Sequence, residues 1–209
     1  MRRTPIVVAA ATLVAGVAVF SVLAQPQSGA QPPTTAAEKK KMIVAAMATL
    51  PGPSDQHKLL SPFVGEFDMV TELSVGEGDA ISFHAVEKGQ SIMGGLFVKV
   101  ESTSAPDEEL KGDRLIVYGF DPYTKKYTMW GVESQNPTSI TATGDFDPAT
   151  KTFTFEGEVT QPPAGEKLPF RWIVHVKDDG SMEQQIQMRP AAGEDFQKVV
   201  GVLHTPKKK

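Results

Sequence analysis

The chain of 209 residues contains no cysteine and carries little surplus charge of either sign. The lack of cysteine excludes disulfide scaffolds, thiolate metal sites, cysteine nucleophiles and a lipid-modified N-terminal cysteine. The formal net charge is −4, and it becomes −6 if a leader containing Arg2 and Arg3 is removed, because 19 basic residues then face 25 acidic ones. We therefore do not expect a nucleic-acid partner.

Short catalytic motifs are also missing. The sequence has no Gly-x-Ser-x-Gly, no Ser-x-x-Lys, no His-Glu-x-x-His, no phosphate-binding glycine loop and no calcium-loop spacing. Catalytic groups can assemble from distant positions, so an enzyme stays open, but nothing here gives a positive reason to predict one. No pattern predicts a cofactor or a metal site.

The N-terminus has the pattern of a secretory signal. Arg2 and Arg3 precede eighteen uncharged residues, Ile6 to Leu23, and small residues lead to a cleavage site after Ala24. We predict a signal peptide over residues 1–24 and a flexible Gln/Pro/Ser/Thr-rich linker over 25–37. The alternative is an uncleaved membrane anchor, since eighteen apolar residues just span a bilayer core. Either way we expect the functional part outside the cytoplasm, periplasmic or secreted, with membrane contact only if the leader remains.

The rest of the chain has the size of one domain, which we place at residues 38–206, followed by a basic tail at 207–209. Glu38 to Leu50 has a helical composition with an apolar stripe, and Pro51-Gly52-Pro53 ends it. Ser54 then caps a short helix that runs to about Leu60, before Ser61-Pro62.

From Phe63 onward the apolar residues alternate with period two, as in half-buried strands. The positions that share one face of each strand are Phe67/Met69/Thr71/Leu73/Val75, Ile81/Phe83/Ala85, Leu96/Val98/Val100, Phe170/Trp172/Val174/Val176 and Met182/Ile186/Met188, apolar except for Thr71. We count nine or ten strands at hairpin spacing with no long helix between them. The prediction is an all-β fold, an antiparallel up-and-down β-barrel preceded by one or two short helices.

An internal repeat supports hairpin connections. Residues 120–131 match residues 146–157 at a shift of 26, and each copy begins Phe-Asp-Pro. Asp followed by Pro favours a type I turn, because proline presets φ and the Asp side chain accepts hydrogen bonds from backbone N–H groups ahead of it. The alignment pairs Tyr127 and Met129 with Phe153 and Phe155, so we expect all four to face the core and Trp130 to face outward.

Polar and bulky residues on the inward faces are the candidate ligand contacts. Thr71 and Gln184 interrupt apolar rows, and a buried amide costs free energy unless a neighbour, a water or a ligand hydrogen-bonds it. Most aromatic residues on such faces belong to the core. The predicted ligand-binding residues are Trp172, Tyr127, Gln184, Phe83, Thr71 and Met69.

Four histidines remain. His84 and His175 alternate with apolar neighbours, so we expect both to be solvated. The facing of His204 is undecided, because valines lie on both faces of the last strand; facing inward, it could bind a haem iron. His57 could act as a base in a hydrolase or isomerase, but its place at the end of a short helix also suits a plug closing the barrel.

An ordered set of segments resembles the domain-of-unknown-function family numbered 1579. The segments are Pro51-Gly52-Pro53-Ser54-Asp55-Gln56-His57-Lys58, Leu60, Gly65-Glu66-Phe67, Met93-Gly94-Gly95-Leu96-Phe97-Val98, Tyr118-Gly119-Phe120-Asp121, Tyr127, Trp130 and Ser134. The resemblance spans about Pro51 to Leu203 and implies a calycin-like, lipocalin-type barrel. Phe67 stands where the family commonly has Trp, and no arginine closes the last strand, so a lipocalin-style lid of Trp on Arg is not expected. The resemblance carries over no catalytic residue.

Together these observations predict an extracytoplasmic barrel that binds a small apolar or amphipathic molecule in its interior. The size of that interior is decisive, because small barrels either fill with side chains or leave room for one ligand. The sequence predicts no oligomeric state.

Overall fold

The computed structural model describes residues 35–73, 80–161, 165–190 and 193–207. The predicted signal peptide, most of the predicted linker and the last two lysines of the basic tail lie outside these residues. Within the described ranges, no helix is long and apolar enough to cross a membrane. The chain forms two units, Met1–Pro51 and Gly52–Lys209.

In the first unit, helix α2 (Ala36–Ala48) begins two residues before the predicted start. A capping box explains this position: the Glu38 N–H donates to Thr35 Oγ1 at 3.2 Å, and the Thr35 N–H donates to Glu38 Oε2 at 2.9 Å. None of the helix residues is buried, and Val44 and Met47 are about half exposed. The helix is therefore held by local hydrogen bonds rather than by core packing.

The second unit begins with two short helices, α3 (Asp55–Lys58) and the 3₁₀ helix η1 (Ser61–Phe63). Leu60 and Phe63 are fully buried, and the Phe63 ring stacks on Tyr118 with centroids 4.4 Å apart. The Phe63 carbonyl lies so close to Gly89 that a Cβ there would meet it at 1.6 Å. The two helices thus close one end of the sheet, and glycine at 89 makes the close approach possible.

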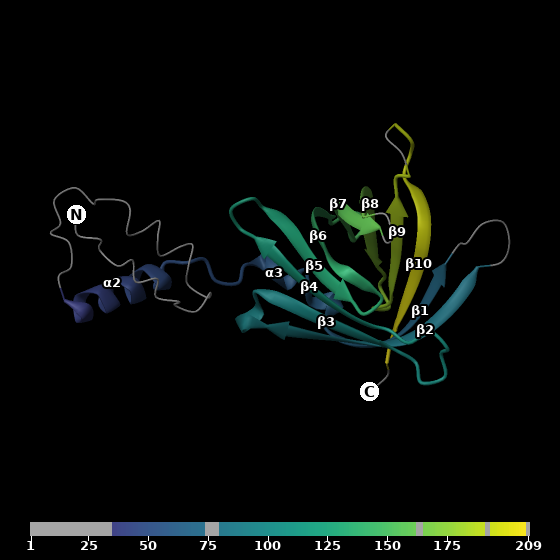
Figure 1. Ribbon diagram of the computed structural model, residues 1–209. Helices are drawn as coiled ribbons and strands as arrows, with labels where there is room; N and C mark the ends of the chain where they lie inside the picture. The colour runs from purple at the N-terminus through teal and green to yellow at the C-terminus, as the bar shows by residue number, and fades with distance from the viewer. Residues whose placement is uncertain (1–34, 74–79, 162–164, 191–192, 208–209) are drawn as a thin grey trace, which may run out of the picture. The chain divides into compact units, whose positions relative to one another are not determined.

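Ten antiparallel strands form a closed barrel in the order β1-β10-β9-β8-β7-β6-β5-β4-β3-β2 (Figure 1). Pairing of β1 with both β10 and β2 closes the ring, and Met69 lies opposite His204 and Ala85. The fold prediction is confirmed, including the strand count. The strands are β1 (Gly65–Leu73), β2 (Ile81–Ile92), β3 (Phe97–Ser104), β4 (Asp113–Asp121), β5 (Lys126–Glu133), β6 (Asn136–Asp147), β7 (Thr152–Gln161), β8 (Glu166–Val176), β9 (Met182–Met188) and β10 (Gln197–Pro206), with the 3₁₀ helix η2 (Met93–Gly95) between β2 and β3.

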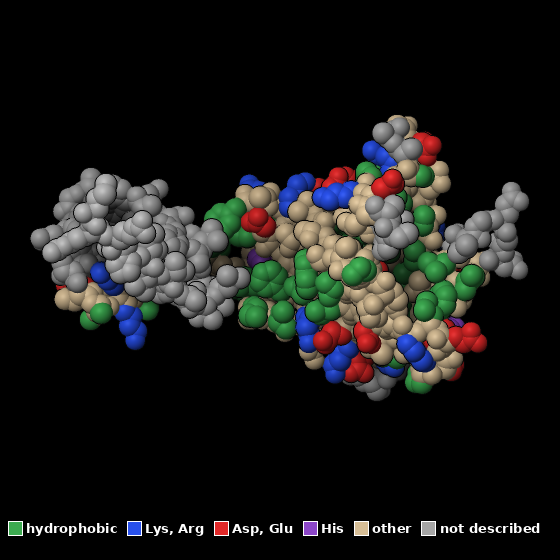
Figure 2. Space-filling model, in the orientation of Figure 1, with side chains coloured by type: hydrophobic (Ala, Val, Ile, Leu, Met, Phe, Trp, Pro, Cys, Tyr) green, Lys and Arg blue, Asp and Glu red, His purple; other side chains and the backbone are tan. Residues whose placement is uncertain are grey.

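The repeated hairpins face as predicted. Tyr127, Met129, Phe153 and Phe155 are all buried, whereas Trp130 is 41% exposed on the outer face. In the turns, Asp121 Oδ1 accepts from the Tyr123 N–H at 2.8 Å, and Asp147 does the same for the equivalent residue of its turn. Outward positions carry charges of both signs, which lie interspersed on the face shown in Figure 2. The alternation therefore separates an aromatic core from a mixed polar surface.

Candidate binding site inside the barrel

A cavity of about 280 Å³ lies inside the barrel, toward the end away from η1. Its apolar lining includes Met69, Leu73, Phe83 and Ala85, from the second half of β1 and the first half of β2. Ser102 and Arg114, from β3 and β4, add polar groups. The volume lies just below the range for small-molecule sites, roughly 300 to 1,000 Å³, so only a small ligand fits.

A larger hollow of about 650 Å³ lies on the outside of strands β2 to β5. Outward residues such as Val86, Leu115 and Val132 line it, together with charged Lys88 and Glu101. Both hollows are open to solvent to a similar degree. The interior cavity is the better candidate, because buried Met69 and the inward-facing residues Phe83 and Ala85 line it.

The predicted ligand contacts fall into three places. Met69, Thr71 and Phe83 line the interior cavity. Trp172 and Gln184 are buried in the opposite wall, on β8 and β9. Tyr127 lies instead beside α3: its hydroxyl donates to Gln56 Oε1 at 2.8 Å, and burial raises its pKa to about 12. Tyr127 is not part of this cavity's lining.

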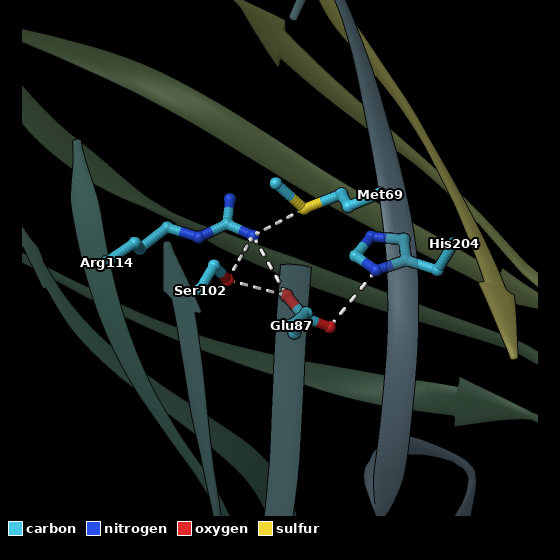
Figure 3. Close-up of polar contacts among 5 residues, drawn as sticks. All are labelled: Met69, Glu87, Ser102, Arg114 and His204. Carbon is cyan, nitrogen blue, oxygen red and sulfur yellow. Dashed lines mark hydrogen bonds and ion pairs between the residues drawn. The ribbon is translucent and has the colours of Figure 1, made fainter. Parts of the chain in front are cut away.

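Five inward side chains from adjacent strands form a buried polar network, shown in Figure 3. Glu87 Oε2 accepts from Ser102 Oγ at 2.9 Å and from an Arg114 NH2 group at 3.1 Å. The same Arg114 nitrogen lies 3.4 Å from Met69 Sδ. Glu87 Oε1 lies 3.0 Å from Nδ1 of His204, which is ion-pair distance, although this contact lacks the alignment of a hydrogen bond.

The charge at the centre of this network is anionic. Glu87 is 2% exposed and His204 is 0% exposed, so neither reaches solvent. Burial by itself raises the pKa of the Glu87 carboxyl, but the contacts with His204, Arg114 and Ser102 outweigh burial and hold this pKa below its ordinary value. The cation of Arg114 is therefore already matched by the anion of Glu87.

Five buried polar atoms have no hydrogen-bond partner among the described residues: Trp172 Nε1, Gln184 Oε1, Arg189 Nε and both ring nitrogens of His204. The guanidinium carbon of Arg114 lies 5.5 Å from the centroid of the Trp172 ring, which connects strand β8 to the network. The barrel interior thus combines a cavity of mixed lining, a paired Arg–Glu centre beside it, and buried polar atoms without hydrogen-bond partners on β8, β9 and β10.

The histidines differ in environment. His84 is exposed, as predicted, and His175 is half-buried, with Nδ1 3.3 Å from Thr152 Oγ1. His57 is buried, and its Nδ1 accepts from the Ser54 N–H at 3.0 Å, so that nitrogen caps helix α3. His204 faces inward, which answers the question that the sequence left open.

Sequence reasoning missed three members of the network: Glu87, Ser102 and Arg114. A signal for Glu87 was present, because the alternation Ile81, Phe83, Ala85 continues to position 87 on the inward face. Ser102 follows the row of Val98 and Val100 in the same way. A charged residue that continues an apolar row was therefore the readable sign of this site.

Metal binding gains no support from the geometry. No group of three or more His, Asp or Glu side chains in the described part of the chain is placed to hold a metal ion. The His204 ring has the carboxylate partner typical of metal-binding histidines, but it is fully enclosed and does not line the cavity. The residues around it do not fit a haem.

Comparison with known proteins identifies the family. A family model described as "Protein of unknown function (DUF1579)" matches residues 52–204. The chain belongs to the DUF1579 family. This match covers the whole of the barrel except the end of β10, and it agrees with the resemblance found in the sequence.

Other similarities of this DUF1579 protein concern the fold alone. Among solved structures, it is similar to the crystal structure of Rv2717c from M. tuberculosis, with a TM-score of 0.56 and 10% sequence identity. That similarity covers 75% of this chain and 100% of the other. No curated protein sequence matches the chain.

Proposed function

We propose that this protein binds a small amphipathic molecule inside the barrel. The apolar part of the ligand packs against Met69, Leu73 and Phe83, and its polar end reaches toward Ser102 and Arg114. The observation that carries the proposal is the interior cavity of about 280 Å³, whose lining combines apolar side chains such as Met69, Leu73 and Phe83 with polar ones such as Ser102 and Arg114. Burial of each ligand methylene would contribute roughly 0.8 kcal/mol before the costs of association.

The proposal is tested with two variants of adjacent residues on β2. Ala85 points into the cavity, whereas Val86 points outward and lines the outer hollow. Ala85→Phe fills the interior, and Val86→Phe fills the outer hollow. Native mass spectrometry and thermal shift with a panel of short-chain amphipaths would measure binding. We expect Ala85→Phe to abolish binding and Val86→Phe to retain it; the reverse pattern would locate the ligand outside the barrel.

The enzyme alternative has less support. Its candidate base, His57, is occupied as a helix cap, and the ring packs edge-on against Phe120 at 5.6 Å. The haem alternative needs space beside His204 Nε2, where protein encloses the ring. Visible absorbance after mixing with haem tests it: a Soret band that His204→Ala removes would favour haem over a small amphipath.

We further propose that the protein acts outside the cytoplasm. The support is the sequence alone: two arginines, an uncharged run from Ile6 to Leu23 and small residues before Gln25. Mass measurement of the protein from the envelope fraction should give a chain that begins at Gln25. A full-length chain in the membrane fraction would instead indicate an anchor.

A further inference from the structure

Arg114 is anchored in the barrel interior through one end of its guanidinium group. Within the described residues, its Nη2 atom makes all the hydrogen bonds of the side chain: to Glu87 Oε2 at 3.1 Å, to Ser102 Oγ at 3.4 Å and to Met69 Sδ at 3.4 Å (Figure 3). The guanidinium carbon also lies 5.5 Å from the centroid of the Trp172 ring. These contacts fix the orientation of the guanidinium before any ligand arrives.

The other end of the guanidinium keeps unused hydrogen-bond donors. An arginine side chain carries N–H groups on Nε, Nη1 and Nη2, and it accepts no hydrogen bond. Within the described residues, Nε and Nη1 of Arg114 donate to no acceptor, and neither is among the buried polar atoms without a partner. Both atoms therefore reach open space. Because Arg114 lines the interior cavity and its side chain is 17% exposed, these donors are available to a ligand there.

The charges around Arg114 disfavour a charged ligand group. The guanidinium cation is already paired with the Glu87 carboxylate. Two more carboxylates, those of the exposed residues Asp113 and Glu133, belong to the cavity lining. An anionic head group would meet these three carboxylates with one guanidinium to offset them. A cationic head group would lie beside the guanidinium and could accept no hydrogen bond from it. An uncharged acceptor oxygen avoids both costs.

We propose that Arg114 selects the polar end of the ligand, and that its Nε–H and Nη1–H groups donate hydrogen bonds to an uncharged acceptor oxygen, such as the carbonyl of a ketone, ester or amide. Because Glu87 and Ser102 already hold the guanidinium in place, these bonds form with little loss of side-chain entropy. The inference rests on the proposed function, since it names the ligand class and the specificity-determining residue of the same cavity.

The test compares molecules of similar length that differ in the polar group. 2-Octanone carries the acceptor oxygen, 2-methyl-1-octene has a methylene group in place of that oxygen, and octanoate and octylammonium carry opposite charges. The chain has two tryptophans, so Trp130→Phe leaves Trp172, which lies beside Arg114, as the only fluorescent reporter of binding. At neutral pH we expect 2-octanone to bind about tenfold more tightly than each of the other three, the effect of one hydrogen bond from a charged donor.

Further variants show whether Arg114 sets the preference. Arg114→Lys keeps a cation for Glu87 but loses the free guanidinium donors, so 2-octanone should bind within about twofold of 2-methyl-1-octene. The matched control is Arg171→Lys, because Arg171 points outward from β8 and pairs with Glu156; this variant should keep the difference. If Arg114→Lys does not fold, the double variant Glu87→Gln/Arg114→Met removes the pair without leaving one charge alone, and it should show the same loss.

The outcomes separate the two proposals. Equal affinities for 2-octanone and 2-methyl-1-octene would mean that Arg114 donates to no ligand atom. Tighter binding of octanoate would mean that the cation of Arg114 is not offset, and tighter binding of octylammonium would mean that Asp113 and Glu133 select the head group. Each of these results, or a preference for 2-octanone that survives Arg114→Lys, overturns this inference and leaves the proposed function standing. Absence of binding by all four molecules would overturn both.

Discussion

Replacing Glu87 by alanine removes the carboxylate that His204, Arg114 and Ser102 share. The Arg114 guanidinium would keep its charge while losing its partner, and its side chain is only 17% exposed. Breaking a buried ion pair by deleting one member costs about 3 to 5 kcal/mol, because the remaining charge is buried without compensation. The cost would be a large share of the roughly 5 to 15 kcal/mol that stabilises a typical domain.

Urea denaturation followed by Trp172 fluorescence measures this loss. With a slope of about 2 kcal/mol per molar urea, a loss of about 4 kcal/mol lowers the midpoint by about 2 M. The matched control is Glu66→Ala, which breaks the neighbouring exposed pair with Lys88 and should cost less than about 1 kcal/mol. Equal and small effects of the two substitutions would refute a buried, charge-paired centre.

Three other predictions test the rest of the structure. The pKa of Glu87 is lowered in the folded protein, so its carboxylate stabilises the fold above the ordinary pKa of 4.5, and this contribution is lost as the pH falls through the lower folded value. In urea titrations from about pH 6 to pH 3, the stability of Glu87→Gln should therefore fall less with acid than that of the unchanged protein. Identical pH profiles of the two proteins would contradict this. His57→Ala should lower the free energy of unfolding by about 1 to 2 kcal/mol, because the cap of helix α3 is lost. His57→Gln should recover part of that free energy in the same urea assay. Equal stabilities of the two variants would mean that the cap has no role. Gly89→Ala should lower the free energy of unfolding by at least about 2 kcal/mol, because the new Cβ would overlap the Phe63 carbonyl. The control is Gly52→Ala, whose Cβ would have nothing within 4 Å and which should change stability by less than about 0.5 kcal/mol. Similar thermal midpoints for the two variants would contradict the close packing of η1.

The barrel could be predicted because its strands obey simple alternation. The repeated hairpin, for example, allowed the facing of Tyr127, Met129, Phe153 and Phe155 to be read from one alignment, and all four are buried. Turn chemistry was equally local, since Asp121 bonds the backbone two residues ahead. Features set by near neighbours are readable in this way because they need no knowledge of which strands pair.

The buried network depends on contacts that alternation does not specify. Arg114 and Glu87 are 27 residues apart in sequence, and they meet only because β2, β3 and β4 are adjacent. His204 was ambiguous because β10 has valines on both faces, and a register shift between Lys198 and Val200 changes the facing along that strand. The same limit applied to Tyr127, whose inward position was predicted correctly but whose partner is Gln56 on α3 rather than the cavity.

A crystal structure with a heavy-atom-labelled ligand would test most directly whether the molecule binds in the barrel interior. In crystals soaked with 8-bromo-1-octanol, the anomalous signal of bromine marks the end of the chain without interpretation of side chains. We predict a bromine site beside Met69, Phe83 and Ala85 in the interior cavity. A bromine site in the outer hollow, against Val86 and Leu115, would contradict the proposal.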